Sequence, residues 1–376
     1  MKNILITGGA GFIGSNLAKE LVSRGYTITI LDNLSKQVHG NNQNSDLYNS
    51  IKDISNFILG DVCNKSDWNK ALKGQDAVIH LAAETGTGQS MYEITRYNHV
   101  NIVGTSHMLN ILANDTHTIK KIIIASSRAI YGEGRYYCEK EGFVFPKSRS
   151  KEDLSNSVFD IFSSVTKNKL ELTSTDELSN IDPISIYGIT KQNQEQMSML
   201  TGKVLNIPTV SLRYQNVYGP GQSLSNPYTG ILSIFSTRLL NNNHIEIYED
   251  GKQSRDFVYI DDVVKATVLS LESDAANHQI FNVGSGEPTS VITVANILHE
   301  LYESRSTITI TNKYRTGDIR HNYADLKKIK SLINYNPTID FLTGVKKFVD
   351  WVKQQEINPD SYESSVNELA QKGFFK

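Results

Sequence analysis

A glycine-rich turn near the start of the chain limits what this sequence can fold into. Thr7-Gly8-Gly9-Ala10-Gly11-Phe12-Ile13-Gly14 follows an apolar run at 3–7 and precedes a stretch with helical periodicity. Its glycines permit a tight turn and close packing of the next helix, and that helix would point its positive end at a pyrophosphate. The spacing is GxxGxxG instead of the standard GxGxxG, so the turn alone fits a plain strand-to-helix connection as well.

Short apolar runs alternate with helical patterns through the first two-thirds of the chain. We expect strands at 3–7, 27–32, 55–61, 77–81, 121–126, 209–214 and 279–284, and helices at 14–24, 68–73, 101–112 and 185–205. Strands that are nearly all apolar are typical of a sheet covered on both faces by helices. The alternation predicts an α/β protein with a Rossmann-like, doubly wound parallel sheet.

The rhythm changes after Tyr218, where Gly219-Pro220-Gly221 forms a turn. Beyond it we expect helices at 230–241, 291–302 and 342–355, a hairpin at 244–255 and a strand at 307–312. We therefore expect a dinucleotide-binding domain at 1–217, rejoined by 255–285, and a smaller α+β substrate-binding lobe at 218–254 and 286–376. The polar stretches 37–50 and 147–157 are typical of surface loops.

Carboxylates at strand ends strengthen the case for a dinucleotide. Asp32 ends the second expected strand, where it can accept hydrogen bonds from an adenosine ribose. A carboxylate there repels a 2′-phosphate, and no Arg follows it directly, which favours NAD over NADP. Asp61-Val62 would lie at the adenine edge, although Asp61 fits a helix N-cap equally well. Further expected cofactor contacts are Gly8, Gly11, Phe12, Ile13, Gly14, Asn33, Leu81, Ala82, Ala83 and Asn101.

A second set of residues carries the chemistry. Tyr187 and Lys191 lie at i and i+4 on one face of a predicted helix. A cation beside a phenol lowers the pKa of the phenol, so Tyr187 could serve as a base near neutral pH. Alone, such a pair is usually a surface contact. Here Ser127 follows the fifth strand and could bond the substrate oxygen that Tyr187 deprotonates, so we expect Ser127, Tyr187 and Lys191 to be catalytic.

The ordered set of motifs resembles the extended short-chain dehydrogenase/reductase family, in particular its nucleotide-sugar epimerases and dehydratases. The resemblance runs from Met1 to about Asp350 and includes the glycine turn, Ser127 before Tyr131-Gly132, and Tyr187-Gly188-Ile189-Thr190-Lys191. It implies bound NAD, a nucleotide-diphosphate sugar as substrate, and a homodimer. The substrate residues that it implies are Gln89, Ser90, Arg128, Asn216, Tyr228, Arg255, Arg315 and Asp318.

The arginines suit a diphosphate because the planar guanidinium binds it in a bidentate manner. Without the resemblance, Arg255 and Arg315 would read as surface ion pairs and Asn216 as a turn residue.

The residues after Ser127 bear on the reaction. Members of the resembled family that eliminate water carry an Asp-Glu pair there, whereas this chain has Arg128 and Ala129, which cannot supply the required acid and base. A net reductase would exchange its cofactor and often prefers NADPH, against which Asp32 argues. The resemblance therefore implies 4-epimerisation through a 4-keto sugar. A non-catalytic NAD-binding sensor is a further alternative, although such proteins usually lose the Tyr or the Lys.

Four segments, at 37–40, 86–93, 130–134 and 225–230, resemble epimerases of dTDP-L-rhamnose. They imply interconversion of dTDP-L-rhamnose and dTDP-6-deoxy-L-talose. A UDP-hexose or a UDP-N-acetylhexosamine is the alternative substrate.

The chain departs from the family between its catalytic hydroxyl groups. About 60 positions separate Ser127 from Tyr187, so we expect an insertion near 135–177 that acts as a lid at the site. Tyr136 and Tyr137 fit either a sugar-stacking surface or a small core of the insertion. Similar proteins sometimes hold zinc there through paired cysteines. This chain has only Cys63 and Cys138, so we expect no metal.

Charge and hydropathy exclude other classes. The net charge is −2, with basic and acidic residues interleaved, which disfavours nucleic acid and anionic membranes as partners. No apolar run approaches the ~20 residues of a membrane span, and the first residues run directly into an apolar strand. We expect a cytoplasmic protein.

Overall fold

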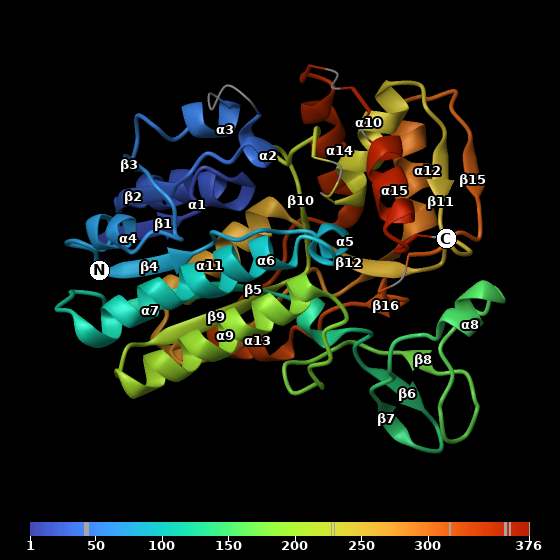
Figure 1. The fold of residues 1–376 in the computed structure, drawn as a ribbon, viewed down its shortest axis with the longest axis horizontal. Coiled ribbons are helices and arrows are strands. Elements are labelled where there is room, and N and C mark those ends of the chain that lie inside the picture. The colour runs from blue at the N-terminus through green and yellow to red at the C-terminus, as the bar shows by residue number, and fades with distance from the viewer. Residues whose placement is uncertain are drawn as a thin grey trace.

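A seven-stranded parallel sheet forms the centre of the molecule (Figure 1). The structure, a computed structural model, describes residues 1–40, 45–226, 228, 230–315, 317–356, 359–360 and 362–375. The strand order is β13-β9-β5-β4-β1-β2-β3, which confirms the predicted doubly wound sheet and places a switch point between β1 and β4. The strands are β1 (Asn3–Thr7), β2 (Thr27–Asp32), β3 (Asn56–Leu59), β4 (Ala77–His80), β5 (Lys121–Ser127), β9 (Thr209–Tyr214) and β13 (Ile280–Val283).

Alternate residues of each strand face opposite helical layers. Ile4 and Ile6 of β1 belong to the larger hydrophobic core with α1 (Phe12–Ser23) and α11 (Ile260–Glu272). Leu5 belongs to the second core on the other face. The helices of that second layer are α4 (Lys65–Ala71), α7 (Gly104–Asn114) and α9 (Ile186–Val204), and α7 is preceded by a π-helical turn, η1 (Asn98–Val103). Because both faces are covered, the strands are almost uniformly apolar.

The glycine turn brings β1, α1 and the end of β4 into close contact. Gly8 has φ of +67°, and a Cβ on it would lie 2.8 Å from the Ala82 nitrogen. A Cβ on Gly14 would lie 2.6 Å from the Gly9 Cα. Only residues without a side chain allow α1 to start so close to the strand ends.

A smaller lobe lies at the carboxyl ends of the sheet strands, as predicted. It contains two small sheets, one of β10 (Asn216–Tyr218), β12 (Ser254–Tyr259), β14 (Pro288–Ser290) and β16 (His321–Asn322), the other of β11 (Ile245–Ile247) and β15 (Ile308–Ile310). Its helices include α10 (Ile231–Leu240), α12 (Val291–Leu301), α14 (Phe341–Val352) and α15 (Tyr362–Gln371), whereas α13 (Lys327–Ile333) packs against β13 of the central sheet.

The hairpin predicted at 244–255 is wrong. β11 pairs in parallel with β15, whereas β12 pairs with β10, β14 and β16. The expected turn exists at Gly251, which has φ of +76°. However, neighbours from elsewhere in the chain occupy both edges of β12, while Ile245 and Ile247 of β11 are buried in the larger core.

Two stretches expected as loops contain short helices. Residues 37–50 include α2 (Lys36–His39) and α3 (Asp46–Asn49), and 41–44 between them lie outside the described residues. Residues 147–157 include α8 (Lys151–Ser155), which Ser150 caps by accepting a hydrogen bond from the Asp153 nitrogen.

The insertion near 135–177 folds into a three-stranded sheet of β7 (Gly142–Val144), β6 (Tyr136–Cys138) and β8 (Glu171–Leu172). Tyr136 is buried in a small core of the insertion, and Tyr137 stacks edge-on against Phe143. The two ends of the insertion meet, because the Arg135 nitrogen donates to Thr175 Oγ1 at 3.1 Å. The insertion is thus a small folded unit on a closed neck.

Buried ion pairs attach the insertion to the smaller lobe. Arg149 of the insertion pairs with Glu249 at 2.7 Å, and both side chains are almost fully buried. Arg320 of the lobe pairs with Asp160 of the insertion at 3.1 Å and with Asp250 at 2.6 Å. A hinged lid would have to break the Arg149–Glu249 pair in a poorly hydrated environment, and with it the Arg320–Asp160 pair, whose carboxylate is more exposed.

We expect Gly14→Ala to lower the free energy of unfolding by about 1–3 kcal/mol, because the new methyl group displaces the packed glycine turn. Urea denaturation of the cofactor-free protein measures this change. Gly11→Ala is the matched control, since a Cβ on Gly11 meets only the Gly8 carbonyl oxygen, at 3.3 Å. Equal stability of the two variants would contradict the close-packing argument.

Candidate active site

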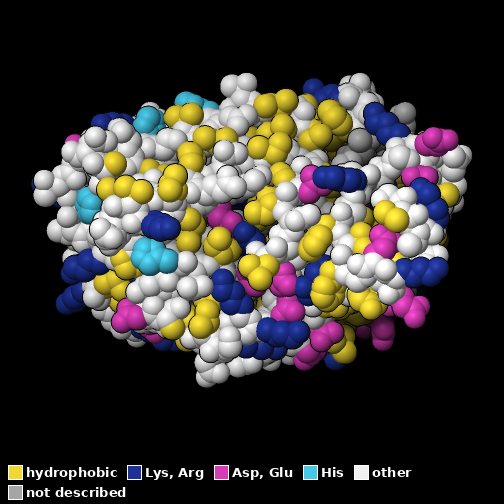
Figure 2. Space-filling view, turned by 90° about the horizontal axis from the view of Figure 1, so that it is seen from below, with side chains coloured by type: hydrophobic (Ala, Val, Ile, Leu, Met, Phe, Trp, Pro, Cys, Tyr) yellow, Lys and Arg dark blue, Asp and Glu magenta, His cyan; other side chains and the backbone are white. Residues whose placement is uncertain are grey.

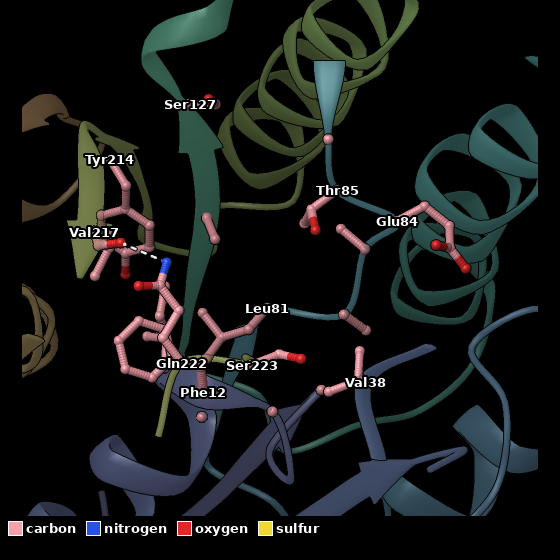
Figure 3. A pocket seen from close by; sticks show the side chains of 18 of the residues that line it. Phe12, Val38, Leu81, Glu84, Thr85, Ser127, Tyr214, Val217, Gln222 and Ser223 are labelled. Atoms are coloured by element: carbon pink, nitrogen blue, oxygen red, sulfur yellow. Dashed lines mark hydrogen bonds between the residues drawn. The ribbon is translucent and has the colours of Figure 1, made fainter. Parts of the chain in front are cut away.

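A continuous cavity runs along the carboxyl ends of the central strands, between the glycine turn and the smaller lobe. Figure 3 shows Phe12, Leu81 and Val38 at one end and Ser127 at the other. Val217 and Gln222 form a side wall, where Gln222 donates a hydrogen bond to the Val217 carbonyl oxygen at 3.3 Å. The predicted site residues that line this cavity are Gly8, Gly11, Phe12, Ile13, Gly14, Asp32, Asn33, Val62, Leu81, Ala82, Ala83, Ser127, Arg128, Tyr187, Lys191, Asn216 and Tyr228.

The glycine-turn end of the cavity fits a dinucleotide. Gly11 caps α1 without a side-chain hydrogen bond, so the first N–H groups of this helix have no capping oxygen from that residue. Helix N-termini of this kind bind phosphate oxygens. Asp32 lies beside the turn and accepts hydrogen bonds from the Ala10 nitrogen at 3.0 Å and the Leu34 nitrogen at 2.9 Å. These two hydrogen bonds fix the carboxylate where it lines the glycine-turn end of the cavity.

The predicted adenine-edge residue Asp61 lies just outside the cavity lining. Its side chain accepts hydrogen bonds from Asn33 Nδ2 at 3.0 Å and from the Cys63 nitrogen at 2.8 Å. The alternative that Asp61 caps a helix is wrong, because α4 begins at Lys65 with Asn64 at its N-cap, whereas Asp61 closes a turn with the Cys63 nitrogen and holds Asn33 at the cavity.

The three predicted catalytic residues converge at the other end of the cavity. Ser127 is the last residue of β5, and Tyr187 and Lys191 lie in the first two turns of α9, which packs against β5. Burial raises the pKa of Tyr187, and its hydrogen bond with Ser127 and the charge of Arg128 oppose that rise. The protein alone therefore favours the neutral phenol, and a further positive charge beside Tyr187 would favour the phenolate.

Lys191 is buried without a carboxylate partner. Its ammonium donates to the Ala125 carbonyl oxygen at 2.7 Å and to Gln194 Oε1 at 2.9 Å. Burial lowers the pKa of Lys191 to about 7. Gln194 is oriented in turn by Thr105, whose hydroxyl accepts from Gln194 Nε2 at 2.8 Å. At neutral pH, Lys191 is therefore close to equally populated in its charged and neutral forms.

A cluster of arginines surrounds Asp318 beyond the catalytic end. Burial favours the neutral form of Asp318, but Arg255, Arg315, Arg128 and Arg149 outweigh it and lower the pKa of the carboxyl. Arg255 pairs with Asp318 at 2.7 Å. The sequence predicted Arg128, Arg255 and Arg315 but missed Arg149, which comes from the insertion and has no local motif.

Arg128 is the member of this cluster that lines the cavity. Its Nε donates to Asn216 Oδ1 at 3.2 Å, which brings two predicted substrate residues together. Burial, followed by repulsion from Arg255, lowers the pKa of Arg128 to about 10. An anion in the cavity would relieve that repulsion and stabilise its positive charge.

Three other predicted residues support the cavity without lining it. Asn101 accepts from the Glu84 nitrogen at 2.8 Å and donates to Thr190 at 2.9 Å, which ties the loop after β4 to α9. Ser90 donates to the Thr87 carbonyl oxygen at 2.6 Å. Gln89 is hydrogen-bonded to Gln37 at 2.9 Å.

Sequence reasoning also missed several residues that line the cavity. Gln37 and Val38 were expected in a surface loop, although the segment 37–40 had been singled out for its resemblance. The others come mainly from the loop after β4 and from the loop after β10. They include Glu84, Thr85, Gly86, Gln222, Ser223, Asn226 and Leu232.

Other classes of ligand receive little support from the described part of the chain. Within it, no group of three or more His, Cys, Asp or Glu side chains is arranged to hold a metal ion. No described helix is long and apolar enough to cross a membrane. On the face seen in Figure 2, Lys and Arg side chains are interspersed with Asp and Glu, with no broad region of one charge.

The comparison with known proteins agrees with this geometry. Residues 4–151 and 155–284 match the NAD dependent epimerase/dehydratase family. A dTDP-L-rhamnose 4-epimerase from Burkholderia thailandensis is 35% identical over 94% of this chain and 96% of its own length.

Solved structures give the same result. A mutant UDP-glucuronic acid 4-epimerase from Bacillus cereus, in complex with UDP-4-deoxy-4-fluoro-glucuronic acid and NAD, has a TM-score of 0.77 at 27% identity. It covers 94% of this chain and 99% of its own. A UDP-N-acetylglucosamine 4-epimerase from Methanobrevibacter ruminantium, with UDP-N-acetylmuramic acid, has a TM-score of 0.73 at 31% identity and the same coverage.

We expect Asp32→Ala to shift the ratio of NAD to NADP affinity toward NADP by about tenfold, because a buried carboxylate that would repel a 2′-phosphate is removed. Titration of each dinucleotide into the cofactor-free protein measures the ratio. Asp53→Ala, at an exposed position away from the cavity, is the matched control. An unchanged ratio would place ribose recognition elsewhere.

Proposed function

The chain belongs to the NAD dependent epimerase/dehydratase family and is an NAD-dependent nucleotide-sugar 4-epimerase, and we propose that it interconverts dTDP-L-rhamnose and dTDP-6-deoxy-L-talose. The observation that carries the reaction is the meeting of Ser127, Tyr187 and Lys191 in the cavity that the glycine turn also lines. A surface Tyr-Lys pair would not be buried, nor would it share a cavity with a phosphate-binding turn.

The residues divide the work of the reaction. Bound NAD supplies a reversible hydride acceptor and returns the hydride, so no net oxidation occurs. Tyr187 takes the proton of the C4 hydroxyl and later gives it back to the C4 oxygen. Ser127 hydrogen-bonds the same oxygen, and the buried Lys191, one helical turn from Tyr187, adds positive charge to the site when it is protonated. The cofactor-binding and substrate-binding roles of the other cavity residues are part of this proposal.

Arg128 separates this chain from sugar dehydratases. Elimination of water requires an acid for the leaving hydroxyl and a base for the neighbouring carbon. Arg128 and Ala129 stand directly after Ser127, and Arg128 faces the cavity next to Asn216. We assign Arg128 to a sugar hydroxyl or to the phosphate nearest the sugar, where a guanidinium can donate two parallel hydrogen bonds.

The choice of nucleotide sugar is the finer part of the proposal. It is supported by the 35% identity to a dTDP-L-rhamnose 4-epimerase and by the segments 37–40 and 86–93, which resemble that group. Gln37 and Val38 of the first segment and Gly86 and Thr87 of the second line the cavity. UDP-sugar 4-epimerases among the solved structures keep a UDP-hexose or a UDP-N-acetylhexosamine open as the alternative.

We expect Tyr187→Phe to retain NAD and lose at least about a hundredfold in turnover, because the general base is removed while the ring stays in place. Initial rates with a converted nucleotide sugar and the absorbance of released cofactor measure the two quantities. Tyr137→Phe, in the insertion, changes an exposed tyrosine in the same way and should act as the parent does. Near-normal turnover of Tyr187→Phe would overturn the assignment of the base.

We expect the purified protein to epimerise dTDP-L-rhamnose at C4 more efficiently than UDP-glucose, UDP-N-acetylglucosamine or any GDP-sugar. NMR of the product at C4, with each nucleotide sugar in turn, measures this selectivity. Faster conversion of a UDP-sugar would replace the substrate proposal and leave the reaction class intact. Binding of NAD without conversion of any nucleotide sugar would identify a sensor.

A further inference from the structure

The last described helix, α15, and the residues after it lie against the cavity, although no motif in the sequence pointed to them. Figure 1 shows α15 in red beside α5 (Thr87–Ser90). Leu369 of α15 is buried, and a Cβ on Gly88 would lie 3.8 Å from its methyl groups. We propose that this C-terminal segment, residues 362–375, positions two predicted substrate residues: Tyr228, which lines the cavity, through Glu368, and Arg315 of the adjoining arginine cluster through Phe375. The inference rests on the proposed function for the identity of the ligand.

The first contact fixes Tyr228 at the catalytic end. The Tyr228 hydroxyl donates to Glu368 Oε2 at 2.8 Å and lies 2.7 Å from the Tyr92 hydroxyl. Because a carboxylate only accepts, the Tyr228 proton goes to Glu368, and Tyr92 must donate to Tyr228. Lys372 of the segment lies 4.6 Å from the centre of the Tyr92 ring. Both hydrogen-bond directions are therefore set by one carboxylate on α15.

Tyr228 is close to the chemistry. A Cβ on Gly86 would lie 3.4 Å from the Tyr228 Cβ and equally far from the Tyr97 hydroxyl. The Tyr97 ring packs edge-on against catalytic Tyr187, with ring centroids 6.5 Å apart. A shift of Tyr228 would thus change the wall of the cavity that faces the sugar.

The second contact fixes Arg315 in the arginine cluster. Arg315 and Phe375 form an antiparallel backbone bridge, and the Phe375 ring lies 5.0 Å from the Tyr248 ring. The Arg315 guanidinium stacks on that Tyr248 ring at 4.9 Å. Tyr248 is also hydrogen-bonded through its hydroxyl to Tyr362 of α15. The segment therefore holds both the backbone and the stacking partner of Arg315.

Arg315 retains capacity for a ligand. Its Nε is buried and has no hydrogen-bond partner among the described residues. By contrast, the two terminal nitrogens of Arg255 donate to Asp318 and to three backbone carbonyl oxygens. A buried donor without a partner is costly, and an acceptor from a diphosphate would satisfy it. Of these two arginines, Arg315 is the one whose Nε has no hydrogen-bond partner among the described residues. Phe375 holds the backbone of Arg315 and so keeps this side chain near Asp318.

The test uses the NAD-loaded Tyr187→Phe protein, so that binding is measured without turnover. Titrants are dTDP-L-rhamnose and UDP-glucose, with dTDP and UDP as their sugar-free counterparts. Glu368→Ala should weaken binding of the nucleotide sugar by about tenfold and leave binding of the nucleoside diphosphate within about twofold, because Tyr228 lies at the sugar end. Phe375→Ala should weaken both kinds of titrant by about tenfold, because Arg315 holds the diphosphate.

Two controls distinguish positioning from simple stabilisation. Glu368→Gln keeps an acceptor for Tyr228 and should restore binding to within about threefold of the parent. Gln371→Ala changes an exposed residue of the same helix and should bind as the parent does. With Tyr187 intact, Glu368→Ala should raise KM with little change in kcat and none in NAD content.

The inference is overturned if Glu368→Ala and Phe375→Ala bind all titrants as the parent does. It is equally overturned if they lose NAD and thermal stability along with the titrants, since the segment would then only stabilise the fold. Failure of the parent to bind any titrant would remove both this inference and the proposed function. A protein that binds nucleotide sugars but converts none would fail only the proposed function, because the binding comparison still decides the inference.

Discussion

A lysine ammonium buried without a carboxylate is the constraint on which the site depends. Among the described residues, Lys191 donates to the Ala125 carbonyl oxygen and to Gln194, so its position requires β5 and α9 to pack in one register. Gln194 is locked by Thr105, which donates in turn to the Asn101 carbonyl oxygen at 2.6 Å. The burial that makes the ammonium costly also raises the pKa of the catalytic tyrosine. The packing of the two helical layers on the sheet offsets the free-energy cost of burying this ammonium.

The parts of the fold that could be predicted from the sequence are those with a local signature. Strands covered on both faces read as apolar runs, the glycine turn follows one of them, and Tyr187 and Lys191 share a helix face by spacing alone. The failures involve distant partners. β11 finds its partner strand at 308–310 instead of in the next segment, Arg149 pairs with Glu249, and Tyr228 bonds Glu368. Nothing in a short window of sequence encodes such pairs.

The cofactor end and the substrate end of the cavity are held in place by different parts of the structure. Its cofactor end is built from backbone at the ends of central strands, which the sheet holds rigidly. Its substrate end is lined from the loop after β10 and from Arg128, and the insertion and the last described helix support it from behind through Arg149 and Glu368. Arg149 of the insertion and Arg255 and Arg315 of the smaller lobe approach Asp318, and their mutual repulsion is offset by Asp318 and by the carboxylate of Glu249, which pairs with Arg149. Substitutions that change substrate specificity are therefore expected at this end of the cavity, because few of its residues also belong to the hydrophobic core.

Because the two ends of the insertion meet, the length of the insertion does not determine the distance between Ser127 and Tyr187, although it determines their separation in sequence. Arg135 and Thr175 are hydrogen-bonded, so residues 136–174 form a side branch and contribute nothing to the spacing of Ser127 and Tyr187. That spacing is set by the strand and the helix on which the two hydroxyl groups stand. Insertions, deletions or replacements within residues 136–174 would therefore leave the distance between the two catalytic hydroxyl groups unchanged. New binding surfaces can evolve at this position without altering the reaction geometry.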